Sequence, residues 1–125
     1  MPFKCDFVDE VCMWNEERDN LVYLPALEYT MLAEELLEYK EAVYSNHRVD
    51  QADALADLAV VALGGLFKLC NGDLEDVHLI LTAVTAANNT KSSTKNAEGK
   101  ITKPANFVGP EGMIRRILND YWTTL

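Results

Sequence analysis

Several carboxylates fall on a helix face that the sequence pattern otherwise reserves for apolar residues. In the second helical segment, a turn of about 100° per residue places Glu35 and Glu38 inside an apolar stripe, with Glu34 at its edge. The apolar members of this stripe are Leu24, Leu27, Met31 and Ala42. Glu28 and Glu41 lie outside it and are expected to be solvated. An ionised carboxylate on a buried face is costly unless it is paired or bound to a cation. Glu34, Glu35 and Glu38 are therefore candidates for a cation site.

The next helical segment carries a second set of acids. From Ala54 to Phe67 the only polar residue is Asp57, and a helix that is apolar on all sides is expected to be buried. Asp50, Asp53 and Asp57 are spaced i, i+3 and i+7, which places all three on one helix face. The alternative for Asp50 and Asp53 is that they form a helix N-cap and its hydrogen-bonding partner. For Asp57 the alternative is a hydrogen-bonded core aspartate.

These two acidic segments indicate a divalent-cation site. A short connection favours antiparallel packing of the two helices, which would bring five or six carboxylates together. Repulsion would then keep several of them protonated unless a cation compensates. All-oxygen ligands favour Mg²⁺ or Mn²⁺, with Ca²⁺ as another candidate, over zinc. A ferritin-like di-iron site needs two Glu-x-x-His motifs. The sequence has one, from Glu75 to His78, so a di-iron site is not expected.

Helical periodicity dominates the whole sequence and predicts an all-α fold, a helical bundle of four to five helices in a single domain over 1–125. The expected helices cover about 4–19, 25–45, 50–70, 74–88 and 111–122. Residues 89–110 show no periodicity and are predicted to form an irregular loop. Such a long structureless segment in a compact chain signals function or disorder.

The overall charge excludes two classes of partner. With 20 acidic and 11 basic residues the net charge is −9, which disfavours binding to nucleic acid or to an anionic membrane surface. No run of about 18 uncharged apolar residues is present to span a membrane. Three cysteines without a Cys-x-x-Cys pair suit reduced thiols, so a soluble cytoplasmic protein is expected. The bases gather toward the end of the chain, where residues 81–125 hold 6 of them against 3 acids.

The acidic segments resemble those of a known enzyme family. Glu34-Glu35-Leu36-Leu37-Glu38, followed by the segment from Asp50 to Asp57, is similar to the E-E-x-x-E and E-x-x-D signature of MazG-like all-α nucleoside triphosphate pyrophosphohydrolases. The segments Ala87–Lys91, Gly99–Lys100, Lys103–Pro104 and Phe107–Pro110 are similar to those of the phage- and integron-type branch of that family. The resemblance covers roughly residues 25–110.

This resemblance implies Mg²⁺-dependent hydrolysis of a ribo- or deoxyribonucleoside triphosphate to the monophosphate and pyrophosphate, which clears unwanted nucleotides. Glu35 and Glu38 match metal ligands, and Glu34 matches a residue that orients or deprotonates the attacking water. In the second motif aspartate replaces glutamate if Asp50 and Asp53 form it. In the alternative register Asp57 completes the motif and an alanine takes the glutamate position, so all three aspartates remain candidate ligands.

The remaining candidates concern the substrate and the partners. By the resemblance, Lys91 and Lys103 would bind the phosphates, Asn88 would bind phosphate, sugar or base, and the active protein would be a homodimer or homotetramer. From its residue type, Trp14 could stack on a base, with core packing as the alternative. Two non-enzymatic interpretations stay open: a metal- or nucleotide-binding helical module without turnover, and an interaction subunit whose acidic face docks a basic partner.

Overall fold

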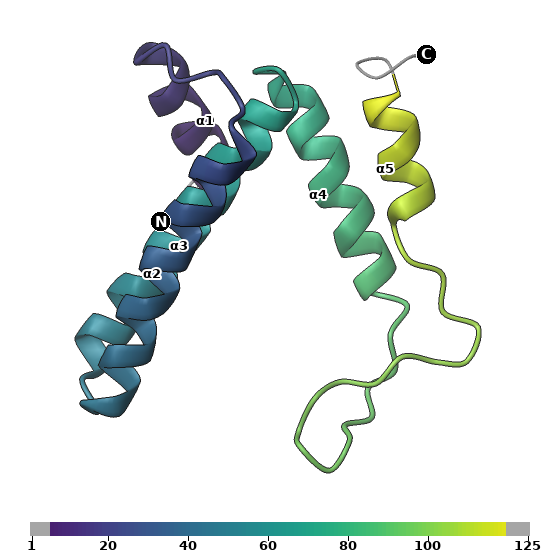
Figure 1. Cartoon of the computed structure of the whole chain (residues 1–125). Helices are drawn as coiled ribbons and strands as arrows, with labels where there is room; N and C mark the ends of the chain where they lie inside the picture. Colours follow the sequence, from purple (N-terminus) through teal and green to yellow (C-terminus); the bar gives the residue numbers. More distant parts are fainter. Residues whose placement is uncertain (1–5, 120–125) are drawn as a thin grey trace, which may run out of the picture. The chain divides into compact units, whose positions relative to one another are not determined.

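The computed structural model describes residues 6–119, and within this range the chain forms five α-helices and no strand (Figure 1). The helices are α1 (Phe7–Glu17), α2 (Pro25–Tyr44), α3 (Arg48–Leu69), α4 (Leu74–Asn88) and α5 (Glu111–Leu118). The predicted all-α class, a helical bundle of four to five helices, is confirmed. No helix in the described part of the chain is both long and apolar enough to cross a membrane.

The chain divides into two compact units, Met1–Leu74 and Glu75–Leu125. The first unit contains α1, α2 and α3, and all the carboxylates of the predicted metal site belong to it. The second contains α5 and nearly all of α4, together with the segment that joins them. The single domain that the sequence suggests over 1–125 stays a prediction.

Local sequence signals set most of the helix ends. Pro25 occupies the first turn of α2, where its missing N–H would have no helical partner in any case. At the end of α3, Asn71 and Gly72 adopt positive φ values of 55° and 74°, which stop the helix. Two predicted bounds differ: α1 ends at Glu17 instead of 19, and α3 begins two residues early. Residues 4–5 and 120–122 of the predicted helices lie outside the described residues.

The turn between α2 and α3 brings these two helices side by side in antiparallel order (Figure 1). His47 caps α3, because its Nδ1 atom accepts the backbone N–H of Asp50 at 3.2 Å. Asp50 is therefore the third helical residue and Asp53 lies a turn further on. The alternative in which these two aspartates form the cap and its partner is wrong, because the histidine takes that position.

Two adjacent glycines on α3 allow its neighbours to approach closely. A Cβ atom on Gly64 would lie 3.2 Å from Nδ2 of Asn15 on α1. A Cβ atom on Gly65 would lie 3.0 Å from Oε2 of Glu28 on α2. Both distances are shorter than ordinary van der Waals contact, so side chains here would push the polar groups of α1 and α2 away from α3.

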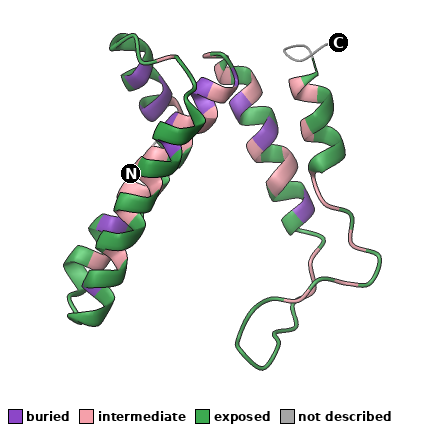
Figure 2. Cartoon of the chain, viewed as in Figure 1, coloured by how far each residue is buried: buried purple, intermediate pink, exposed green. Residues whose placement is uncertain are grey.

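Burial along the apolar helices is uneven (Figure 2). Ala54 and Phe67 on α3 are fully buried, yet Leu55 stays 51% exposed and Val60 40% exposed. The expectation that this helix is buried on all sides is therefore wrong in the structure as described. In the first unit α3 packs against α1 and α2, and two neighbours cover only part of a helix surface.

The segment over 89–110 is not helical, as predicted, but its central part is not structureless. The backbone N–H of Thr102 donates to the carbonyl of Thr94 at 2.9 Å, and Lys95 and Ile101 form an isolated antiparallel bridge. The turn of this short hairpin is closed by the side chain of an asparagine that accepts two backbone N–H groups. Such local side-chain bonds leave no periodic signal in the sequence.

Candidate metal centre between α2 and α3

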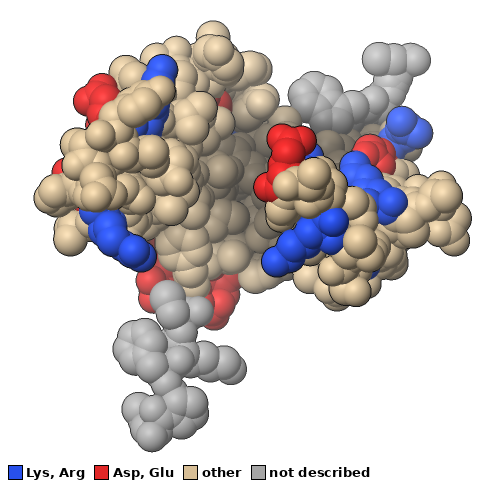
Figure 3. All heavy atoms as spheres, turned by 90° about the horizontal axis from the view of Figure 1, so that it is seen from below, with Lys and Arg blue, Asp and Glu red and all other residues tan. Residues whose placement is uncertain are grey.

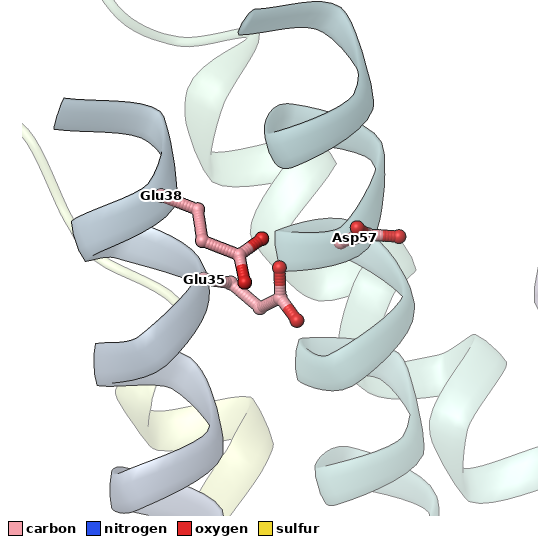
Figure 4. Close-up of side chains that lie close together, drawn as sticks. All are labelled: Glu35, Glu38 and Asp57. Atoms are coloured by element: carbon pink, nitrogen blue, oxygen red, sulfur yellow. The ribbon is translucent and has the colours of Figure 1, made fainter. Parts of the chain in front are cut away.

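Three of the predicted ligands meet between α2 and α3. Glu35 and Glu38 of α2 and Asp57 of α3 each offer a carboxylate oxygen, and these oxygens all lie within 4.8 Å of one another. Both glutamates extend from α2 toward α3 (Figure 4). The Glu38 side chain is exposed, whereas the other two are half-buried. We refer to these three residues as the carboxylate triad.

Glu35 combines a buried carboxylate oxygen with two negatively charged neighbours. Its Oε2 atom is buried and forms no hydrogen bond. Loss of solvation raises the pKa of Glu35 above its ordinary value of 4.5, and the negative charges of Glu38 and Asp57 raise it further. A hydrogen bond with Glu38 acts in the same direction. Without a bound cation, the ionised form of this carboxylate is thus disfavoured. A bound cation would favour the ionised form instead.

A second buried glutamate on α2 shows how the chain neutralises such a charge when it supplies the partner itself. Glu28 forms an ion pair with Lys68 of α3, and both side chains are less than a tenth exposed. The expectation that Glu28 is solvated is wrong. Its spacing of seven residues from Glu35 places both on one helix face, and that spacing was the signal in the sequence. Among the described residues, no lysine or arginine forms such a pair with the triad.

A polar cleft of about 430 Å³ adjoins the triad. It is lined by Glu38, Glu41 and Ala42 of α2, by Ser45 directly after that helix, and by Asp50 and Asp53 of α3. These two aspartates therefore border the cleft instead of joining the triad. Glu38 belongs to both. A volume of this size is within the range of small-ligand sites, so the triad opens onto space that a ligand could fill.

No protein-family model matches the sequence, and no curated protein matches it. The functional assignment therefore rests on the chemistry of the side chains in this site. Four carboxylates of the cleft and two further ones in the triad supply oxygen ligands alone, which suits Mg²⁺ or Mn²⁺. The buried, unpartnered oxygen of Glu35 fits the same interpretation.

The other predicted site residues lie outside the triad and the cleft. Glu34 is exposed on α2. Trp14 on α1 is half-exposed, and the guanidinium carbon of Arg18 lies 4.3 Å from the centre of its ring. Arg18 also donates to the carbonyl of Trp14 at 3.1 Å. One face of this indole is thus occupied by a cation, which leaves less of it for a base than the sequence suggested.

The predicted phosphate-binding residues belong to the second unit. Asn88 is the last residue of α4, and its carbonyl accepts the backbone N–H of Lys91 at 3.0 Å. The Nζ atoms of Lys91 and Lys103 lie 5.9 and 5.2 Å from the ring centre of Phe107. Several lysine and arginine side chains lie on the surface of this unit (Figure 3). Both lysine side chains thus lie close to the same aromatic ring, which the sequence pattern did not reveal.

We expect Mg²⁺ to raise the melting temperature more at about pH 7.5 than at about pH 4.5. Because the folded-state pKa of Glu35 is raised, its contribution to stability without metal is greatest in acid and is lost as the pH rises through that pKa. A bound cation favours the ionised carboxylate and so opposes this loss at the higher pH. Thermal unfolding followed by circular dichroism, with and without Mg²⁺, measures the difference.

Glu35→Gln is the control for this prediction, because glutamine has nearly the same shape and does not titrate. The variant should show a weaker response to Mg²⁺ and less dependence of that response on pH. An equal response of the unmodified protein at both pH values would contradict the role given to Glu35.

Proposed function

We propose that this chain is a Mg²⁺-dependent nucleoside triphosphate pyrophosphohydrolase of the MazG-like all-α type. In this proposal it converts a ribo- or deoxyribonucleoside triphosphate to the monophosphate and pyrophosphate. The observation that carries the proposal is the buried, unpartnered Oε2 of Glu35 beside two further carboxylates. The chain neutralises Glu28, two turns earlier on α2, with its own lysine, and supplies no such partner to Glu35. A site built in this way calls for an external cation.

The residues divide into three roles in this proposal. Glu35, Glu38 and Asp57 hold Mg²⁺, with Mn²⁺ as a substitute, and Asp50 and Asp53 line the adjoining cleft where further ligands are needed. Mg²⁺ held there supplies charge neutralisation for a polyphosphate chain and activation of water. Glu34, exposed one residue before the triad, orients or deprotonates the attacking water.

The candidate residues that are neutral or basic bind the substrate in this proposal. Lys91 and Lys103 neutralise the outer phosphates or the leaving pyrophosphate, and Asn88 binds phosphate, sugar or base. Trp14 offers a ring for stacking, although Arg18 already covers part of it. A chain with a net charge of −9 repels a free polyphosphate, so binding through metal and local lysines is the physically consistent route.

We also propose a homodimer or homotetramer that acts in the cytoplasm to clear unwanted nucleotides. Exposed apolar residues on α2 support self-association, because Leu36 is 58% exposed and Leu37 is 54% exposed. They line a shallow hollow of about 520 Å³ together with Ala33, Tyr39, Lys40, Val43 and Tyr44. The free, buried thiol of Cys12 is consistent with a reducing compartment.

The test is incubation of the full chain with each ribo- and deoxyribonucleoside triphosphate in the presence of Mg²⁺. We expect monophosphate and pyrophosphate from at least one of them, and none after the metal is chelated. No release from any triphosphate would contradict the proposed reaction. Metal binding without release would favour the non-catalytic binding module instead, and absence of metal binding would favour the interaction subunit.

A further inference from the structure

The contact between α2 and α3 contains one buried ion pair, which lies outside the triad and the cleft. Glu28 and Lys68 contact each other with side-chain exposures of 7% and 4%. Room for the carboxylate depends on Gly65, because a Cβ atom there would lie 3.0 Å from Oε2 of Glu28. A buried pair of this kind contributes little net stability compared with apolar side chains of similar size. Its presence therefore needs a reason other than stability.

The spacing along the two helices supplies that reason. Ten residues separate Glu28 from Glu38 on α2, and eleven separate Asp57 from Lys68 on the antiparallel α3. At a rise of 1.5 Å per residue these distances are about 15 and about 16.5 Å. With Glu28 paired to Lys68, Glu38 therefore lies level with Asp57 across the two helices. A slip of one helical turn, about 5.4 Å, would exceed the 4.8 Å within which the triad oxygens lie.

At the end where α2 turns into α3, the short connection and a hydrogen bond from Nε2 of Gln51 to the carbonyl of Ala42, at 3.2 Å, hold the register. The ion pair acts at the opposite end of the contact. Toward the turn that joins α2 and α3, the fully buried residues of the two helices are Ala42 and Ala54. At the other end, Gly64 and Gly65 lie next to the ion pair. Small side chains form shallow ridges and grooves, so by themselves they distinguish only weakly among neighbouring registers. A single buried polar interaction is an established means of selecting one register from such a set.

We propose that Glu28 and Lys68 are positioning residues for the metal centre. Their ion pair fixes the axial register of α2 against α3 and so brings Glu38 opposite Asp57. This inference rests on the proposed function, because it concerns the same triad. Removal of one partner alone would leave an unpaired buried charge and destabilise the fold, so the test replaces both residues together.

The experiment compares Mn²⁺ binding by the full chain with that of two double variants. Glu28→Leu with Lys68→Leu removes the pair and keeps the site apolar, and Glu28→Lys with Lys68→Glu reverses it. Affinity is measured by calorimetry well below the melting temperature, which circular dichroism gives separately. We expect the leucine variant to melt at or above the unmodified protein and to bind Mn²⁺ about 10–100-fold more weakly, with the reversed pair restoring most of the affinity.

A purely structural role would give a different result: changed melting temperatures and unchanged affinity in the folded protein. Equal affinity in the leucine variant overturns the inference, as does a folded reversed variant that binds as weakly as the leucine one. If the leucine variant does not unfold cooperatively, the affinity of the reversed variant decides. Glu16→Leu with Lys95→Leu removes two exposed charges as the matched control and should leave affinity unchanged. Failure of the unmodified chain to bind Mn²⁺ would reject the metal centre and this inference with it.

Discussion

Replacement of Glu38 by glutamine is expected to lower pyrophosphate release by more than about 100-fold while the helices stay intact. Glu38 is shared by the triad and the cleft, so under the proposed function its loss removes a ligand and part of the substrate site together. Loss of groups that merely support metal ligands costs about 10–100-fold, and a direct ligand should cost more. The side chain is exposed, so the amide should leave packing unchanged. Steady-state pyrophosphate release and the circular dichroism spectrum measure the two effects.

Glu16→Gln is the matched control for this substitution. Glu16 is an exposed glutamate on α1, so the same chemical change there should leave both turnover and helicity unaltered. Unchanged turnover in Glu38→Gln would remove Glu38 from the set of ligands. A parallel loss of helical signal would instead assign the effect to folding.

Asp57→Asn is expected to stabilise the protein without metal and to lose that advantage when Mg²⁺ is present. The half-buried carboxylate of Asp57 lies beside Glu35 and Glu38, and removal of one of three like charges relieves their repulsion. With Mg²⁺ bound, the same substitution removes a favourable ligand, so its effect should vanish or reverse. Melting temperatures in the presence of a chelator and of Mg²⁺ give the comparison.

Asp53→Asn serves as the control on the same helix face. Asp53 is exposed and borders the cleft, so its substitution should change the melting temperature less in both conditions. The two variants together also decide which aspartate completes the second acidic motif. If neither the unmodified protein nor Asp57→Asn responds to Mg²⁺, metal binding at Asp57 is contradicted.

The positions of the helices follow largely from local sequence. Pro25 begins α2, and Asn71 and Gly72 stop α3, because each residue type imposes its own backbone conformation. The shared face of Glu35 and Glu38 also follows from the helical period alone. A property that depends on neighbouring residues in the chain can be inferred from the order of those residues.

Burial and charge pairing required the tertiary structure. Glu28 and Glu35 share one face of α2, yet the first meets Lys68 and the second meets two more carboxylates. Lys68 lies forty residues from Glu28 in the sequence, so no local pattern pairs them. The same holds for the exposure of Leu55 on an apolar helix, which depends on how many neighbours cover that helix.

The sequence by itself determined the helices and the face on which each carboxylate lies, because both depend on a period of a few residues. Only the tertiary structure decided which carboxylates lack a partner, because the free energy of a buried charge depends on distances between helices. Among the acidic residues of α2, that difference separates Glu28, which Lys68 neutralises, from Glu35, whose neighbours are two further carboxylates.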